Sequence, residues 1–574
     1  MADLTISPHE PHRDSAPPTG PLSGLGGGTV GRWGLWLEWL SLWVLLFLYA
    51  GLPTPGVNEV HYLCKARHFW DPNWCDRDIF LHSADAHAVF YALFGWLAKF
   101  LPLDAAAWIG RLIGWGLLAF AWQRLSWACV PVRGASLVTA SLFLTGLHYA
   151  HLAGEWVAGG FEAKVIAYVL VLIGLVRVVH GRWSGCWPWF GAAAAFHVLV
   201  GGWTVVASAL AYAFTARLPG ETLVRQIRPL VIGGAIALVG VLPALQLTAT
   251  ATPAEVSEGE RIYVFERLSH HLVFHTFLSE RIQRHGLLLI LLAAVTWGTR
   301  RQPHAWRLAC VALASVAIGL IGIALDQMLS HDPARAARWL KFYWFRLEDV
   351  LVPLATALLA AIYAQSLIDH PPTRAPRAGW VLAALLFLVG LAGVSGAWYE
   401  HRQAFWPEAD LQSELLSSQN PPRARLDWIS ICEWARANTP ADALFLTPLH
   451  VQTFKWYAQR AEWVSWKHIP QDPASLVEWQ RRRNKVQQLA WNPELLPSLL
   501  AEIHRDDGVE YAVISASLLP YVQHAVVRTH NGTYAVLQLF PETQPSLESE
   551  HQPEPQPELQ PDTTQPESDS LTPP

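Results

Sequence analysis

Residues 33–52, WGLWLEWLSLWVLLFLYAGL, are followed at 56–85 by GVNEVHYLCKARHFWDPNWCDRDIFLHSAD. The first stretch is long and apolar enough to cross a bilayer as one helix. No small-residue cleavage site stands behind it, so we expect it to be retained rather than removed as a signal peptide. The second stretch is crowded with acidic, basic, thiol and aromatic side chains. Together they predict a membrane protein whose first loop carries chemistry.

The composition supports a membrane protein. Of the 574 residues, 52% are hydrophobic and only 15% are charged, whereas a soluble globular domain carries roughly 25% charged residues. The net charge of -5 argues against a nucleic-acid partner, which would favour a basic face.

Apolar runs of helix-spanning length recur along the first 400 residues. They lie at 33–52, 86–102, 105–128, 135–152, 163–180, 187–216, 229–248, 285–299, 307–325, 350–368 and 379–398. The 187–216 run is interrupted by Gly201-Gly202 and predicts either one tilted helix or two short ones, and the 86–102 run is short and partly interfacial. The predicted fold is therefore mainly α, with about 11–12 transmembrane helices and a small C-terminal extracytoplasmic α/β domain.

Arginine in short loops predicts the orientation. One set of loops, expected to be cytoplasmic, holds Arg124/Arg133, Arg177/Arg182, Arg217/Arg225/Arg228, Arg300/Arg301/Arg307 and Arg374/Arg377. The other set, 53–85, 153–162, 248–284, 326–349 and everything after 399, is expected to be extracytoplasmic. If 53–85 is extracytoplasmic and the Arg124/Arg133 loop is cytoplasmic, the chain must cross the membrane an odd number of times between them. Two apolar runs lie there, so we expect one of the early helix boundaries to be wrong.

The chain divides into four parts by composition. Residues 1–31 and the Pro/Glu/Gln-rich tail 541–574 are expected to be disordered, 32–400 to form the transmembrane domain, and 405–540 to form a soluble α/β domain. Strand-like runs at 443–448, 510–517 and 533–540 alternate there with helical stretches such as 473–489. The basic run EWQRRRNKV (478–486) leaves two roles open for this domain, a structural lid or the binding of a glycan acceptor.

The first loop admits several interpretations. If it begins as a helix, apolar and basic residues fall on different faces, which predicts an amphipathic helix on the bilayer surface. Glu59, just past the first span, is a candidate general base, and Asp76 and Asp78 are candidates for a second acidic group. The alternative is a polar hairpin that only connects two spans. A Cys64–Cys75 disulfide stays open, as does a zinc site at His61, Cys64 and His68, although nothing in the spacing fixes a four-ligand geometry.

Three later stretches also hold candidate residues. In HYAHLAGEWVAGGFEAK (148–164), Glu155, Glu162 and Lys164 lie at the ends of two spans, where charges are costly unless they are paired or functional. His197 lies inside an apolar run, as a helix-packing or a cavity residue. The 326–349 segment interleaves Arg338 and Arg346 with aromatic residues, which fits either an anionic lipid head group or an ordinary amphipathic connector.

NEVHYL (58–63) and DRDIFL (76–81), with the long first loop and the C-terminal domain, resemble the GT-C superfamily of integral-membrane glycosyltransferases. NEVHYL is similar to the DE-x-x-Y opening of the mannosyl- and aminoarabinose-transferring branches, with Asn58 in place of the first acid. The resemblance implies that Glu59, Asp76, Asp78, Glu155 and Glu162 line one catalytic cavity and that Arg338 or Arg346 holds a lipid phosphate. We add His61 and Lys164 as candidate substrate-binding residues.

The function that follows is transfer of a sugar from a polyprenyl-phosphate donor to an extracytoplasmic glycan, lipid or protein acceptor. A multi-pass protein of the cell inner membrane is implied, with the cofactor left open between none and a divalent cation such as Mg²⁺ or Mn²⁺. The alternatives are a polytopic transporter or flippase and a non-catalytic cell-envelope assembly protein. A transporter predicts charges in mid-span and related halves, whereas the charges here lie mostly at span ends.

Overall fold

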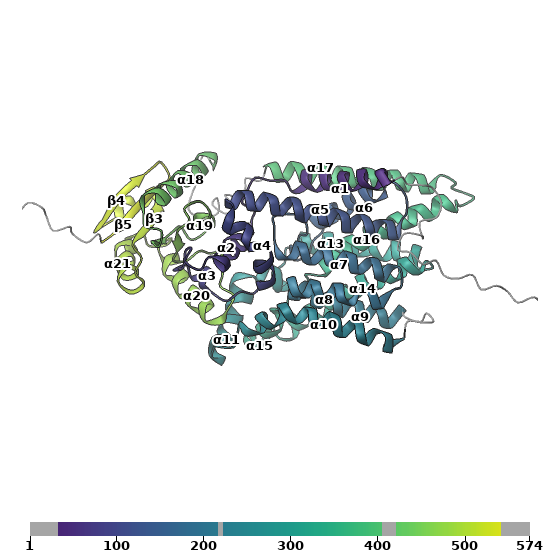
Figure 1. The fold of residues 1–574 in the computed structure, drawn as a ribbon, viewed down its shortest axis with the longest axis horizontal. Coiled ribbons are helices and arrows are strands. Elements are labelled where there is room, and N and C mark those ends of the chain that lie inside the picture. The colour runs from purple at the N-terminus through teal and green to yellow at the C-terminus, as the bar shows by residue number, and fades with distance from the viewer. Residues whose placement is uncertain (1–31, 216–221, 404–420, 541–574) are drawn as a thin grey trace, which may run out of the picture.

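The computed structural model describes residues 32–215, 222–403 and 421–540. The segments 1–31 and 541–574, for which disorder is predicted, lie outside the described residues. A helical bundle forms the larger part of the molecule, and a smaller unit of helices and strands caps one end of it (Figure 1).

Helices occupy all eleven predicted apolar runs. They are α1 (Arg32–Ala50), α4 (Ala88–Phe100), α5 (Leu103–Cys129), α6 (Ala135–Tyr149), α7 (Ala163–Val179), α8 (Trp187–Phe196), α9 (Val198–Thr215), α10 (Leu223–Gln246), α13 (Ser279–Thr299), α14 (Pro303–Met328), α16 (Glu348–Asp369) and α17 (Ala378–Gln403). Among the described residues, α1, α5, α9, α10, α14, α16 and α17 are the seven that are long and apolar enough to cross a bilayer. The chain is thus a multi-pass membrane protein.

The long 187–216 run forms two helices, but the break is not at the glycine pair. His197 has an extended backbone (φ -147°, ψ 98°) and separates α8 from α9. Gly201 lies inside α9, where a Cβ atom would come within 2.0 Å of the Ala194 backbone nitrogen. The glycine therefore allows α9 to pack closely on α8 instead of interrupting the run.

The structure places the loops 53–85 and 153–162 at the same end of the bundle, because residues of both line one cavity. Helix α4, between the first loop and α5, has 13 residues and spans about 20 Å at 1.5 Å per residue, less than the roughly 30 Å of a hydrocarbon core.

The first loop is helical, as predicted, but it is not an amphipathic surface helix. A π-helix, η1 (Val60–Cys64), continues into α2 (Lys65–Trp70), and a short α3 (Ile79–His82) follows. Lys65 is 1% exposed, and its ammonium group donates to the carbonyl oxygens of Phe80 (3.1 Å) and Leu81 (2.7 Å). The basic residue thus points inward and joins two parts of the loop.

The C-terminal domain is built on a five-stranded mixed sheet of order β2-β1-β3-β5-β4. Its strands are β1 (Leu444–Leu446), β2 (Ala461–Glu462), β3 (Tyr511–Ser515), β4 (Ala525–His530) and β5 (Tyr534–Leu539), and its helices are α18 (Pro421–Asn438), α19 (Phe454–Tyr457), α20 (Pro473–Gln488) and α21 (Leu496–Asp507). Alternate residues of a strand face opposite sides. Phe445 accordingly packs with Phe454 on one face, while Leu444 and Leu446 belong to the core that includes α21.

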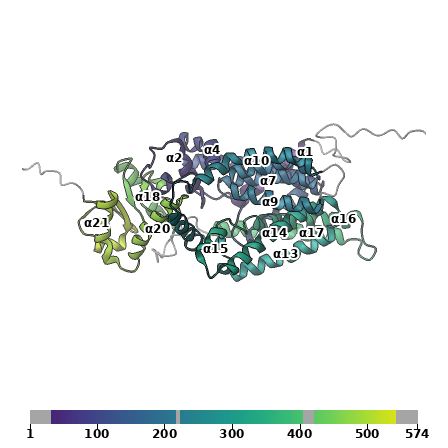
Figure 2. The same cartoon turned by 90° about the horizontal axis from the view of Figure 1, so that it is seen from below.

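A buried ionic cluster attaches this domain to the first loop. The Lys455 ammonium lies 3.1 Å from Asp78, is paired with Glu462, and lies 2.9 Å from Nδ1 of His468. All four side chains are 1% exposed. The C-terminal domain and the first loop therefore share one interior, and the two views place that domain against α2, α3 and α11 (Pro253–Arg261) (Figures 1 and 2).

The basic run 478–486 is neutralised within the fold. Arg481 and Arg482 pair with Glu478, Arg483 pairs with Glu266, and Lys485 pairs with Glu502. The run therefore serves the domain's own structure and its contact with the 248–284 loop.

Candidate active site

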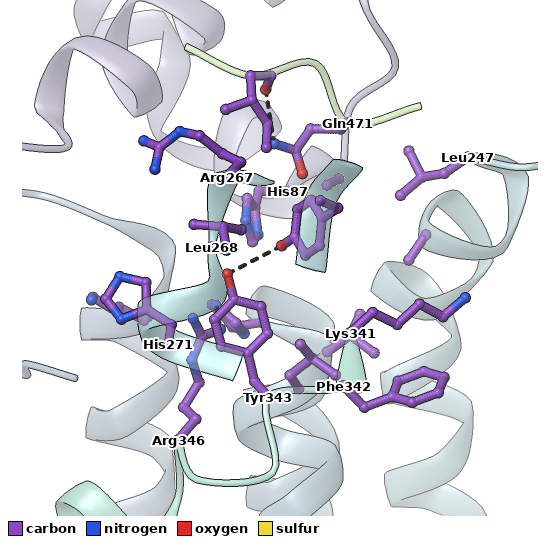
Figure 3. A pocket seen from close by; sticks show the side chains of 18 of the residues that line it. His87, Leu247, Arg267, Leu268, His271, Lys341, Phe342, Tyr343, Arg346 and Gln471 are labelled. Carbon is purple, nitrogen blue, oxygen red and sulfur yellow. Dashed lines mark hydrogen bonds between the residues drawn. The ribbon is translucent and has the colours of Figure 1, made fainter. Parts of the chain in front are cut away.

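A cavity of about 650 Å³ lies where the loops of the bundle meet the C-terminal domain. Its walls come from the first loop, the 153–164 segment, the α8–α9 junction, the end of α10, residues 256–271, residues 341–346 and the C-terminal segment 467–476. Segments from the whole length of the chain thus converge on one space (Figure 3).

Two carboxylates, Glu155 and Glu162, and two cations, Lys164 and Arg346, lie close together on one wall of the cavity. Arg346 Nε lies 3.1 Å from Glu155, and Lys164 Nζ lies 3.6 Å from both Glu155 and Glu162. Lys164 also lies 4.1 Å from the centre of the Trp156 ring. Charges this well buried need such partners, so these four residues form one ionic group at the cavity.

Buried residues of the helix bundle fix the position of Glu155. Asp349, in the first turn of α16, is fully buried and accepts hydrogen bonds from the backbone amides of Leu152 (2.5 Å), Ala153 (2.9 Å) and Glu155 (3.1 Å). His285 Nδ1 donates to the Ala150 carbonyl oxygen at 2.8 Å, and its Nε2 lies 3.1 Å from a carboxylate oxygen of Glu348. Helices α13 and α16 therefore hold the loop that presents Glu155.

Arg346 is held on a strained turn. Tyr343 has a φ of +53°, in the left-handed region that residues with a bulky side chain seldom adopt. Its ring lies under the Arg346 guanidinium at 3.8 Å, and its hydroxyl is hydrogen-bonded to that of Tyr263 at 3.2 Å (Figure 3). His197 Nε2 lies 3.2 Å from Arg346 Nη1. Although burial opposes the charged form, Glu155 raises the pKa of Arg346 above its ordinary value, so it remains a cation.

Glu162 differs from Glu155 in its surroundings. It is 1% exposed, and it accepts hydrogen bonds from Asn58 Nδ2 (3.3 Å) and Trp156 Nε1 (3.1 Å). Burial raises the pKa of Glu162, and Lys164 and these two donors only partly offset that effect. A carboxylate with a raised pKa is suited to accept a proton near neutral pH.

The opposite wall is apolar and belongs to the membrane helices. It is formed by Val198 and Leu199 of α9 and by Val241, Ala244 and Leu245 of α10. Leu245 is 66% exposed and lies in a helix that is long and apolar enough to cross a membrane. The cavity therefore joins a charged wall to an apolar wall made by two such helices.

The lining carries a net positive charge. Its cationic side chains are Lys164, Arg267, Lys341, Arg346 and Lys467, and its carboxylates are Glu155, Glu162 and Glu260. The histidines do not add to it, because burial lowers the pKa of His87 to about 4 and that of His271 to about 3. Five cations against three carboxylates leave two positive charges, which favours an anionic ligand.

Of the residues predicted for this cavity, His61, Glu155, Glu162, Lys164 and Arg346 line it. Glu59 does not: it is fully buried, and both its oxygens are bonded to Arg111 at 2.6 Å. It also accepts from the backbone amides of Gly56 (2.6 Å) and Phe161 (3.0 Å). With all these partners its geometry is that of a positioning residue, which ties the first loop to α5 and to the segment that ends at Glu162.

Three other predicted positions lie away from the cavity. Asp78 caps α3, accepting from the amides of Phe80 and Leu81 at 3.0 Å, and belongs to the Lys455 cluster. Asp76 is exposed to solvent. Arg338 is exposed on α15 (Pro333–Leu340), which presents its apolar face inward and so turns this arginine outward. Of the two arginines predicted to hold a lipid phosphate, only Arg346 lines the cavity.

The cysteine and metal alternatives are not supported. Cys64 and Cys75 are both buried free thiols, so they form no disulfide. In the described part of the chain no three His, Cys, Asp or Glu side chains converge as metal ligands, and His61, Cys64 and His68 do not. Glu155 and Glu162 already face Lys164 and Arg346. These side chains do not fit a divalent-cation site.

Several residues of the site were missed from sequence. Asp349, which supports the loop of Glu155 without lining the cavity, stands directly before the predicted 350–368 span, where a charge is costly unless it is paired or functional. Tyr343 and Tyr263 give no local signal, because only the fold brings them together. Arg267 stands in the 248–284 loop among several other charged residues, and nothing in the sequence singles it out.

The fold and the cavity define a multi-pass membrane protein with a small C-terminal sheet domain. Two solved structures of an oligosaccharyltransferase from Archaeoglobus fulgidus, the first of them named AglB, are similar to this chain. One, in complex with an inhibitory peptide and a dolichol-phosphate, shows 10% identity over 84% of this chain and 69% of that chain at a TM-score of 0.46. The apo form shows 11% identity over 84% and 70%, at the same TM-score.

ArnT from Cupriavidus metallidurans in the apo state is also similar, with 15% identity over 88% of this chain and 96% of that chain and a TM-score of 0.43. A family model described as a domain of unknown function, DUF6798, matches residues 426–486. No curated protein matches the chain. With similarity this distant, the function has to be argued from the residues of this chain.

Proposed function

We propose that this protein is a membrane glycosyltransferase that transfers a sugar from a polyprenyl-phosphate donor to an acceptor hydroxyl. The observation that carries the proposal is the junction of two walls in one cavity, an apolar wall from α9 and α10 and a charged wall with Arg346 and Glu162. An amphiphile with a long apolar tail and an anionic head fits both walls at once.

In this reaction the donor's tail lies along α10 and its phosphate lies at Arg346. The arginine forms charge-assisted hydrogen bonds with phosphate oxygens, and it is already oriented by Tyr343 and His197. When the phosphate leaves, it gains negative charge, so a cation held beside it stabilises the transition state.

Glu162 is the general base. The acceptor oxygen bonds to the anomeric carbon of the sugar while the bond from that carbon to the phosphate oxygen breaks. The polyprenyl phosphate leaves with that electron pair, and the acceptor's proton passes to Glu162. Glu155 orients Arg346, and Lys164 keeps Glu155 and Glu162 from repelling each other.

The test compares lipid-linked sugar profiles in the native host for the wild type and Glu162→Gln. Arg338→Ala serves as the control, because Arg338 is a predicted site residue that is exposed and lies outside the cavity. We expect Glu162→Gln to accumulate an unused polyprenyl-phosphate sugar at normal expression, and Arg338→Ala to resemble the wild type. A normal profile for well-expressed Glu162→Gln contradicts the assignment of the base.

A further inference from the structure

The cavity has a second charged region that the proposed transfer leaves without a role. We name it the roof and define it by Arg267, His270, Lys467 and Gln471, all of which line the cavity. Arg267 ends the π-helix η3 (Ile262–Arg267), and His270 lies in α12 (Ser269–Leu272). Lys467 and Gln471 come from the C-terminal domain. Arg267 and Gln471 lie at one end of the cavity, and Arg346 lies at the other, beyond Tyr343 (Figure 3).

The segments that form the roof are held in place by hydrogen bonds to other parts of the protein. Arg267 Nε donates to the Trp466 carbonyl at 3.0 Å, and its guanidinium lies 5.4 Å from the centre of the Trp466 ring. Asp472 caps α20 through the Ser475 amide (2.9 Å) and also accepts from the Ala84 amide of the first loop (3.1 Å). The segment that carries Lys467 and Gln471 is thereby fixed to two loops of the bundle.

The two roof cations, Arg267 and Lys467, both affect the protonation of His270. Partial burial together with Arg267 and Lys467 lowers the pKa of His270 to about 4, so this imidazole is neutral beside two positive charges. Cationic side chains therefore lie at both ends of the cavity, Arg267 at one end and Arg346 at the other (Figure 3).

We infer that the roof is a binding subsite for an anionic acceptor, whose phosphate or carboxylate group is held by Arg267 and Lys467 while its hydroxyl reaches Glu162. This inference rests on the proposed transfer, because it assigns the second substrate of that reaction. The donor needs the apolar wall of α10, whereas the roof is made by segments outside the apolar spans, so its occupant presents a hydrophilic group. Guanidinium and ammonium groups together suit an oxyanion.

The experiment measures binding of inorganic phosphate to the full-length protein in phosphatidylcholine nanodiscs, with and without saturating undecaprenyl phosphate. The variants are Lys467→Ala, Lys467→Met, which keeps most of the side chain's apolar stem, and Arg267→Gln. Lys485→Ala is the matched control, since Lys485 lies in the same domain, pairs with Glu502 and does not line the cavity.

We expect inorganic phosphate to bind when undecaprenyl phosphate is already present, and each roof variant to weaken this binding by about tenfold. Their affinity for undecaprenyl phosphate should stay that of the wild type, and Lys485→Ala should change neither. The inference is overturned if undecaprenyl phosphate abolishes phosphate binding, or if the roof variants bind phosphate as the wild type does. Failure of undecaprenyl phosphate to bind would instead contradict the proposed donor, and the measurement without lipid would still test the roof.

Discussion

Both oxygens of the Glu59 carboxylate accept hydrogen bonds from Arg111, one from Nε and one from Nη2, each at 2.6 Å. Glu59 is 0% exposed and Arg111 2% exposed. The pair joins the end of the first membrane helix to α5, and Glu59 also accepts from the amide of Phe161 at 3.0 Å. The acid that first attracts attention in the sequence therefore lies behind the cavity and supports the segment that carries Glu162.

Glu59→Gln should destabilise the protein before it affects chemistry. Removing one partner of a buried ion pair leaves a buried charge uncompensated, which costs about 3–5 kcal/mol. We expect a lower thermal unfolding midpoint for the purified variant, and partial recovery when Arg111→Gln is added. A variant that is as stable as the wild type but has lost activity would contradict this role and restore Glu59 as the base.

Lys455→Met should loosen the C-terminal domain. The change leaves Asp78 and Glu462 buried without their shared cation, and each has 1% side-chain exposure, so we expect a loss of about 3–5 kcal/mol. Limited proteolysis should show earlier cleavage of the C-terminal domain than in the wild type. Lys485→Met, on the surface of the same domain, is the control, and equal sensitivity of the two variants would show that the cluster is not the anchor.

The overall plan was predictable because its signals are local. Apolar runs predicted the long helices of the membrane bundle, and short strand-like runs predicted β1, β3 and β5, whereas β2 is two residues long and β4 is mostly exposed, so neither gives a pattern. It was less predictable whether a charged side chain faces the cavity or is buried behind it. Spacing places Glu59 and Glu162 equally near a membrane surface, and only the fold shows that Glu59 meets Arg111 while Glu162 meets the cavity.

The pH dependence of the transfer should report Glu162. Burial raises the pKa of this carboxyl, and a general base acts only when it is deprotonated, so the rate should rise with pH through that raised pKa. The acidic limb of kcat/KM should therefore lie above the value of about 4.3 that is ordinary for glutamate. A profile that is flat from pH 4 upward, or an unchanged limb in the residual activity of Glu162→Gln, would rule out this base.

The most direct test of the central claim is the affinity of the purified protein in nanodiscs for undecaprenyl phosphate, compared among the wild type, Arg346→Gln and Arg338→Ala. A charge-assisted hydrogen bond to phosphate contributes about 1.5–3 kcal/mol, so Arg346→Gln should bind roughly 10- to 100-fold more weakly. Arg338→Ala should bind as the wild type does, because Arg338 does not line the cavity. Unchanged affinity in Arg346→Gln, or an equal loss in both variants, would contradict a lipid-phosphate site at this cavity.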